Sequence, residues 1–148
     1  MKHSKFIVLT CISIGLLLCY SQPSSNEPRR RRYEKIIHDY FGGWEKKNWT
    51  AVASQLGNGF TFTSPNNDDH ISIEQFKEKC WVQAAHIKKF EFVKIIGNDT
   101  EAFALMHVIT NDNKTIRNIE HFTFSNGKIK SIEVFFGGTG QGFPTNEK

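Results

Sequence analysis

Cysteine is scarce in this chain of 148 residues, and the placement of the few cysteines excludes an internal disulfide framework. The sequence holds three, and Cys11 and Cys19 both lie in its apolar N-terminal run. Only Cys80 remains for a folded domain, so no intramolecular disulfide can form there. Because Cys80 falls within an amphipathic helical pattern, we expect a small buried apolar side chain rather than a reactive thiol.

Patterns that bind metals, phosphates or nucleic acids are also missing. The six histidines form no HxH or HExxH motif, and the DDH at 68–70 lacks the spacing of metal ligands. The glycine-rich stretch 137–142 lacks the GK[ST] ending of a phosphate loop. The net charge is +4, but Arg29 to Arg32 supply four positive charges in a row. We therefore expect no metal, no cofactor and no nucleic-acid partner, because a nucleic-acid surface needs basic residues spread over a folded face.

An apolar run at the N-terminus has the pattern of an export signal. Residues 6–20 follow two lysines and number 15, whereas a membrane-spanning helix needs about 20. Small or modest residues just before Gln22 offer a cleavage site, so we expect residues 1–21 to be the signal peptide of a periplasmic or secreted protein. Two alternatives stay open. Residues 6–20 remain as an anchor, with Arg29 to Arg32 on the cytoplasmic side, or Cys19 is lipidated.

The remainder divides into a polar linker at 22–28, one folded domain at 29–138 and a flexible tail at 139–148. Apolar residues recur at i, i+3, i+4 and i+7 from Arg29 to Lys46 and predict a first helix. A second, short helix is predicted for 49–56, where a Gly-Asn-Gly stretch follows and ends it.

Beyond this point a strand, a third helix and a series of strands are expected. The alternating segment 60–65 predicts a strand, and 66–70 predicts a loop. Ser72 and Gln75 form a capping box that begins a helix ending near Ala85. The period then changes to two, and turn sequences separate four predicted antiparallel strands, which span 88–97, 100–110, 114–124 and 128–137.

This order of elements predicts an α+β domain, in which helices pack on an antiparallel sheet. A long, strongly curved sheet can wrap around the helices, and the domain then becomes a cone with a cavity open at one end.

Two segments, YFGGWEKKNWTAVASQLGNGFTFTSP at 40–65 and EHFTFSNGKIKSIEVFFGG at 120–138, resemble SnoaL-like proteins of the nuclear transport factor 2-like superfamily, which also contains ketosteroid isomerase. The resemblance extends over residues 30 to 138. It implies the cone-shaped fold and a homodimer formed through the outer face of the sheet. It does not imply one activity, because the superfamily contains enzymes, ligand-binding proteins and assembly domains.

Compared with the isomerase pattern, Tyr40 and Glu120 stand where the two oxyanion donors stand. Ser64 occupies the position of the proton-shuttling base, and a hydroxyl cannot accept a proton unaided at neutral pH. This departure argues against isomerase chemistry.

Glu120 is the first candidate for a catalytic or ligand-anchoring group. It shares a strand face with Phe122, so a pocket there would bury the carboxyl and raise its pKa. His107 is a candidate base because its free pKa lies near neutrality, or else it is a hydrogen-bonded sheet residue. Tyr40 is a candidate phenol donor. The residues expected to contact a ligand are Tyr40, Trp44, Phe60, Phe62, Ser64, Trp81, Phe103 and Phe122.

The function favoured by these residues is binding of a small apolar or amphipathic molecule in an aromatic-lined cavity. The alternative is an enzyme of the cyclase, isomerase or dehydratase kind that uses Glu120 or His107 for proton transfer. A third reading is an assembly domain whose interior is filled by side chains.

Overall fold

The computed structural model describes the backbone of residues 27–136 and the side chains of residues 32–135. The expected signal peptide at 1–21 and the expected tail at 139–148 lie outside the described residues. Within 27–136, no helix is both long enough and apolar enough to cross a membrane.

Two helices begin the domain. Helix α1 spans Glu27–Glu45, and α2 spans Trp49–Ala53, with the side chain of its N-cap Asn48 accepting a 3.0 Å hydrogen bond from the Ala51 amide. We expected α2 to continue to Leu56, but this was wrong. Leu56 begins strand β1 and pairs with Ile129 of the last strand. A long-range pairing therefore overrides the local helical pattern.

The capping box at Ser72 is confirmed. The Ser72 Oγ accepts from the Gln75 amide at 3.4 Å, and the Gln75 Oε1 accepts from the Ser72 amide at 3.0 Å. Helix α3 is shorter than predicted and spans Ile73–Lys79. The chain then tightens into a 3₁₀ helix, η1, over Trp81–His86 instead of continuing as one α-helix to Ala85.

Six strands form one mixed sheet with the order β2-β1-β6-β5-β4-β3. The strands are β1 Leu56–Ser64, β2 Asp68–Ile71, β3 Ile87–Gly97, β4 Glu101–Thr110, β5 Thr115–Ser125 and β6 Lys128–Phe136. The predicted meander of four antiparallel strands is confirmed as β3 to β6. The expected loop at 66–70 was wrong, because β2 begins at Asp68 and pairs with β1. The sheet is not wholly antiparallel, since β1 runs parallel to β6.

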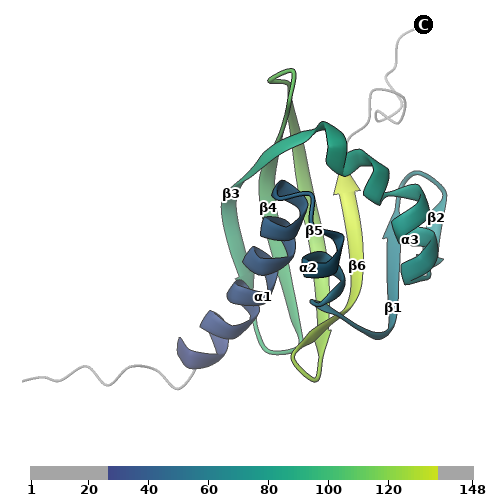
Figure 1. Cartoon of the computed structure of the whole chain (residues 1–148). Helices are drawn as coiled ribbons and strands as arrows, with labels where there is room; N and C mark the ends of the chain where they lie inside the picture. The colour runs from purple at the N-terminus through teal and green to yellow at the C-terminus, as the bar shows by residue number, and fades with distance from the viewer. Residues whose placement is uncertain (1–26, 137–148) are drawn as a thin grey trace, which may run out of the picture.

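The helices lie against one face of this sheet, which curves around them (Figure 1). Alternate residues of each strand point to that concave face, including Ala104 and Met106 of β4, Phe122 of β5 and Ile132 of β6, all of them buried. The opposite, convex face carries Phe103 and other exposed apolar side chains. The expected cone-shaped α+β fold is therefore confirmed.

Candidate functional site

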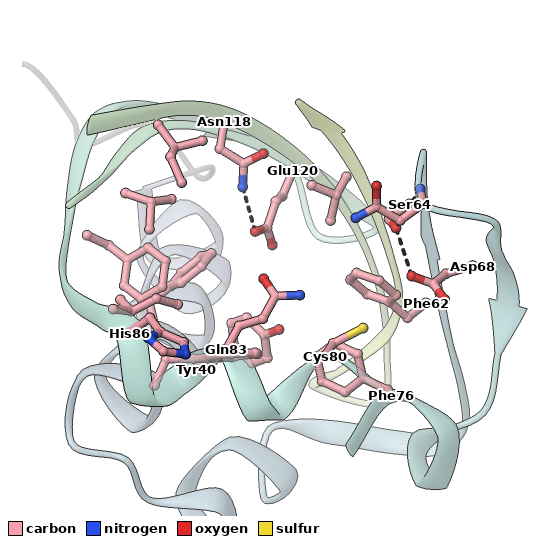
Figure 2. A pocket seen from close by; sticks show the side chains of 18 of the residues that line it. Tyr40, Phe62, Ser64, Asp68, Phe76, Cys80, Gln83, His86, Asn118 and Glu120 are labelled. Carbon is pink, nitrogen blue, oxygen red and sulfur yellow. Dashed lines mark hydrogen bonds between the residues drawn. The ribbon is translucent and has the colours of Figure 1, made fainter. Parts of the chain in front are cut away.

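A cavity of about 320 Å³ lies between the concave face of the sheet, α1 and η1. Its walls are mainly apolar, and α1 supplies the aromatic side chains of Tyr40, Phe41 and Trp44. Phe62 of β1 and Phe76 of α3 line another side (Figure 2). The other apolar residues of the lining are Cys80, Ile87, Phe90, Val108, Ile116 and Val134. Polar side chains interrupt this lining on β5, where β1 meets β2, on η1 (Gln83 and His86) and at Thr110, the last residue of β4.

The first polar place is Glu120, which points into the cavity from β5 and is only 7% exposed. The Asn118 Nδ2 donates a 3.0 Å hydrogen bond to the Glu120 Oε1. Within the described part of the chain, the Glu120 Oε2 and the Asn118 Oδ1 have no hydrogen-bond partner. Burial raises the pKa of Glu120 to about 8, and the hydrogen bond from Asn118 opposes this rise. The carboxyl group is therefore mostly protonated at neutral pH and can donate a hydrogen bond from Oε2.

Tyr40 reaches the same cavity from the middle of α1. Its ring packs edge-on against Phe41 and Phe122, with centroid distances of 5.0 and 6.1 Å. Burial, and next the nearby Glu120 carboxyl group, raise the pKa of Tyr40 well above its ordinary value. The phenol is thus neutral at any physiological pH and is a potential donor. The Trp44 Nε1 is a buried donor without a partner among residues 32–135.

The second polar place is formed by Ser64 at the end of β1 and Asp68 at the start of β2. The Ser64 Oγ donates to the Asp68 Oδ2 at 3.0 Å and accepts from the Asn66 amide at 3.2 Å. Asp68 is 8% exposed, and its Oδ1 lies 3.5 Å from the Nζ of Lys79. Ser64 itself remains unsuited to act as a base, but it lies beside a carboxylate.

Asp68 was not among the residues expected to form the site. The segment at 66–70 has no apolar alternation, so its sequence predicts a loop and gives no reason to bury a side chain. The signal that was missed is the spacing. Ser64 and Asp68 are cross-strand partners joined by a three-residue connection, and turn residues between two short extended segments are typical of a hairpin.

The structure brings five of the expected residues together in the cavity lining: Tyr40, Trp44, Phe62, Ser64 and Glu120. Three others pack beside it: Phe122 and Phe60 are buried, and Trp81 is partly buried. Phe122 packs against Tyr40, Phe60 contacts Phe76 with a centroid distance of 5.5 Å, and Trp81 contacts Trp44 at 4.9 Å. These three support the walls and do not line the hollow.

The placement expected for Phe103 and His107 is corrected by the structure. Strand alternation directs Ala104 and Met106 inward, so Phe103 and His107 face the convex side, away from the cavity. Phe103 stacks on His121 with a centroid distance of 4.5 Å. Neither residue can contact a molecule held in the cavity, and we remove both from the candidate site.

Cys80 is buried and lines the cavity, and burial raises the pKa of its thiol to about 11, so the thiol is neutral. Among the described residues, no group of three or more histidine, cysteine, aspartate or glutamate side chains is placed to hold a metal ion. The chemistry available to the cavity includes hydrogen bonding and proton transfer by its carboxyl and hydroxyl groups and by the imidazole of His86.

Solved structures share this architecture at low sequence identity. A protein from Methylobium petroleophilum with a cystatin-like fold matches with a TM-score of 0.65 and 17% identity, covering 80% of this chain and 83% of that chain. An NTF2-like protein from Cytophaga hutchinsonii matches with a TM-score of 0.54 and 19% identity, covering 70% and 88%. A candidate SnoaL-like polyketide cyclase from Jannaschia sp. CCS1 matches with a TM-score of 0.60 and 12% identity, covering 77% and 89%.

These structures define the class as the NTF2-like α+β cone. The family model for the SnoaL-like domain matches residues 37–132, and the chain therefore belongs to the SnoaL-like domain family. This range includes the whole of the first segment on which the resemblance was based, 40–65, and residues 120–132 of the second. No curated protein matches the sequence.

Proposed function

We propose that this domain binds a small, mostly apolar or amphipathic molecule and holds a carbonyl or hydroxyl oxygen of that molecule at Glu120. The single observation that carries the proposal is the Glu120 Oε2. This oxygen is buried beside an aromatic-lined cavity and has no partner in the described part of the chain. A ligand oxygen would accept the hydrogen bond that the protonated carboxyl group can donate.

A buried carboxyl oxygen without a hydrogen-bond partner lowers the stability of the fold. An unsatisfied buried polar group destabilises a fold by about 1–3 kcal/mol, and a leucine or methionine at position 120 would avoid this cost. A carboxyl group that serves only packing is therefore a poor choice at this position. A role in ligand binding explains the carboxyl group, because a bound ligand would supply the hydrogen bond that Oε2 lacks.

The alternative function is proton-transfer catalysis of the cyclase, isomerase or dehydratase kind. Its support is that Tyr40 and Glu120 line one cavity, together with the candidate polyketide cyclase among the similar folds. Since His107 lies on the other face of the sheet, Glu120 is the one of these two proton-transfer candidates that lines the cavity. Binding is favoured because Ser64, which stands at the base position of the isomerase pattern, cannot accept a proton unaided. His86 in the cavity lining is the basic side chain that a catalytic function would use instead.

The experiment is native mass spectrometry of the protein purified from its own host, in comparison with Glu120→Leu. Leucine keeps an apolar side chain of similar size and removes the polar anchor. We expect a co-purifying small molecule on the wild-type protein and its loss from Glu120→Leu. A wild-type protein without any bound molecule, or a variant that retains it equally, would contradict the proposal.

Two properties outside the cavity are also proposed. Residues 1–21 direct export, which is supported by their short apolar run after two lysines. A second copy of the chain covers the convex face of the sheet. This is supported by the exposed apolar residues there, which include Leu105, Ile119 and Phe135 on three adjacent strands.

A further inference from the structure

Among the described residues that line the cavity, acidic side chains outnumber basic ones. Asp68 and Glu120 are its acidic residues, and no lysine or arginine is among the described residues that line it. Glu120 is mostly neutral at pH 7 because burial raises its pKa to about 8. The carboxylate of Asp68 is therefore the negative charge that a ligand in this cavity meets, and His86 of η1 is the titratable base among the described lining residues.

Asp68 retains hydrogen-bonding capacity for a ligand. A carboxylate offers about four acceptor positions, and the described contacts of Asp68 with Ser64 and Lys79 use two of them. The contact with Lys79 compensates the charge only weakly, because the lysine side chain is 50% exposed and its Nζ lies 3.5 Å away. A donor group that enters the cavity can thus still interact with a negative charge.

The surroundings of Asp68 also suit a cation. Phe62 and Phe76 line this side of the cavity, with ring centroids 4.7 Å apart. The faces of aromatic rings attract ammonium groups. Figure 2 shows Ser64 and Asp68 at one side of the hollow, and Asn118 and Glu120 on the strand that forms another side.

From this arrangement we infer that the cavity selects a ligand with two poles, an oxygen that accepts from Glu120 and an ammonium group that pairs with Asp68, joined by an apolar body. The same arrangement disfavours a ligand that has the same apolar body but carries a carboxylate in place of the ammonium group. That carboxylate would lie near Asp68, and no lysine or arginine in the described lining would neutralise it. This inference rests on the proposed function and names the class of ligand for the same site.

Three probes that share one apolar body test the inference at pH 7 by isothermal titration calorimetry. These are 2-acetylnaphthalene, 6-aminomethyl-2-acetylnaphthalene and 6-acetyl-2-naphthoic acid. A charge-assisted hydrogen bond is worth roughly ten- to hundredfold in affinity. We expect the amine to bind about tenfold or more tightly than the neutral ketone, and the acid to bind about tenfold or more weakly.

Two variants assign the selectivity to Asp68. Asp68→Asn keeps the size of the side chain and removes its charge, so the amine should lose its advantage over the ketone. Lys79→Gln removes the partial counter-charge and should increase the preference for the amine by about two- to fivefold. Lys79 is not in the cavity lining, so this second variant tests the charge of Asp68 even if Asp68→Asn fails to fold.

The outcomes separate this inference from the proposed function. If the ketone binds and Glu120→Leu abolishes its binding, but amine and acid bind equally well, the two-pole inference is wrong and the proposed function stands. An amine preference that is unchanged in both Asp68→Asn and Lys79→Gln also overturns the inference. Failure of all three probes to bind the wild-type protein would contradict the proposed function, and the inference with it.

Discussion

The side-chain amide of Asn118 donates a 3.0 Å hydrogen bond to Glu120, two residues further along β5, and each residue keeps one buried oxygen without a partner in the described part of the chain. Residues two apart on a strand share a face, so both side chains point to the concave side. Asn118 fixes one oxygen of the carboxyl group and leaves the other directed to the cavity. Asn118 therefore holds the Glu120 carboxyl group in place and leaves the hydrogen-bonding capacity of its Oε2 unused.

The first prediction concerns the pH dependence of stability. The pKa of Glu120 rises from 4.5 to about 8 on folding, so between these values the native state binds a proton that the unfolded state has released. The stability associated with Glu120 is fully present below about pH 4.5 and is lost as the pH rises through about 8. The loss is on the order of a few kcal/mol.

Urea unfolding at a series of pH values from about 5 to 9 measures this effect. Glu120→Gln should remove the part of the pH dependence that belongs to Glu120, so the difference between variant and wild type should change steadily with pH. Glu133→Gln is the matched control, because Glu133 is exposed on β6. A constant difference between Glu120→Gln and wild type across the range would show that Glu120 ionises normally.

The second prediction concerns the Tyr40 hydroxyl. Tyr40→Phe keeps the ring that packs against Phe41 and Phe122, so the free energy of unfolding should change by less than about 1.5 kcal/mol. If the hydroxyl donates to a ligand oxygen, binding of 2-acetylnaphthalene should weaken about three- to tenfold. Tyr33→Phe is the control, because Tyr33 belongs to the same helix but does not line the cavity. Equal effects of the two variants on affinity would argue against a role for Tyr40.

The third prediction tests the assignment of the two faces of the sheet. Phe122 is fully buried on the concave face, whereas Phe103 is 42% exposed on the convex face. Phe122→Ala should destabilise the domain by about 3–5 kcal/mol, the usual cost of emptying a core aromatic site. Phe103→Ala should cost less than about 1.5 kcal/mol. Thermal or urea unfolding compares the two, and the reverse order would show that the strand faces are wrongly assigned.

The contrast between these two phenylalanines shows what the sequence can and cannot predict. In β4, the residues Phe103, Leu105 and Ile109 alternate with Ala104, Met106 and Val108, and both sets are apolar. Alternation predicts the strand, but it does not say which set is buried. His107 was therefore placed in the pocket only by assumption. In β5 the alternation is clearer, since Glu120 and Phe122 share a face opposite Ile119 and His121, and the inward direction of Glu120 was predicted correctly.

Contacts between distant segments set the other limit. The four-stranded meander was predictable because its strands alternate and its turns are short and local. The parallel pairing of β1 with β6 and the pairing of β2 with β1 depend on segments that no local pattern connects. For this reason Leu56 was assigned to a helix, and Asp68 was assigned to a loop. Alternation also fixes the face of a residue and not its depth, so it did not distinguish Phe122, in solid packing, from Glu120, at the cavity.

The fourth prediction concerns the proposed second copy on the convex face. Leu105 lies between its cross-strand neighbours Lys94 and Ile119, so Leu105→Lys should place an uncompensated charge in the proposed interface. Light scattering after size exclusion should show a dimer for the wild type and a monomer for this variant. Val82→Lys is the control, because Val82 is exposed on η1 and not on the sheet. A wild-type monomer would refute the proposed dimer.

The fifth prediction concerns the proposed export signal. The intact mass of the protein from its own host should correspond to a chain that begins at Gln22, after cleavage of residues 1–21. A larger mass that fits a lipid on Cys19 would support the lipidation alternative. A mass that begins at Met1 would contradict export with cleavage.

The central claim is that Glu120 stays protonated at neutral pH and offers its hydrogen to a molecule in the cavity. Carbon-13 NMR of glutamate side-chain carboxyl groups, with Glu120→Gln to assign the signal, tests it most directly. We expect a signal that titrates near pH 8 and shifts at pH 7 when 2-acetylnaphthalene is added. A signal that titrates near pH 4.5 and does not respond to the ketone would contradict it.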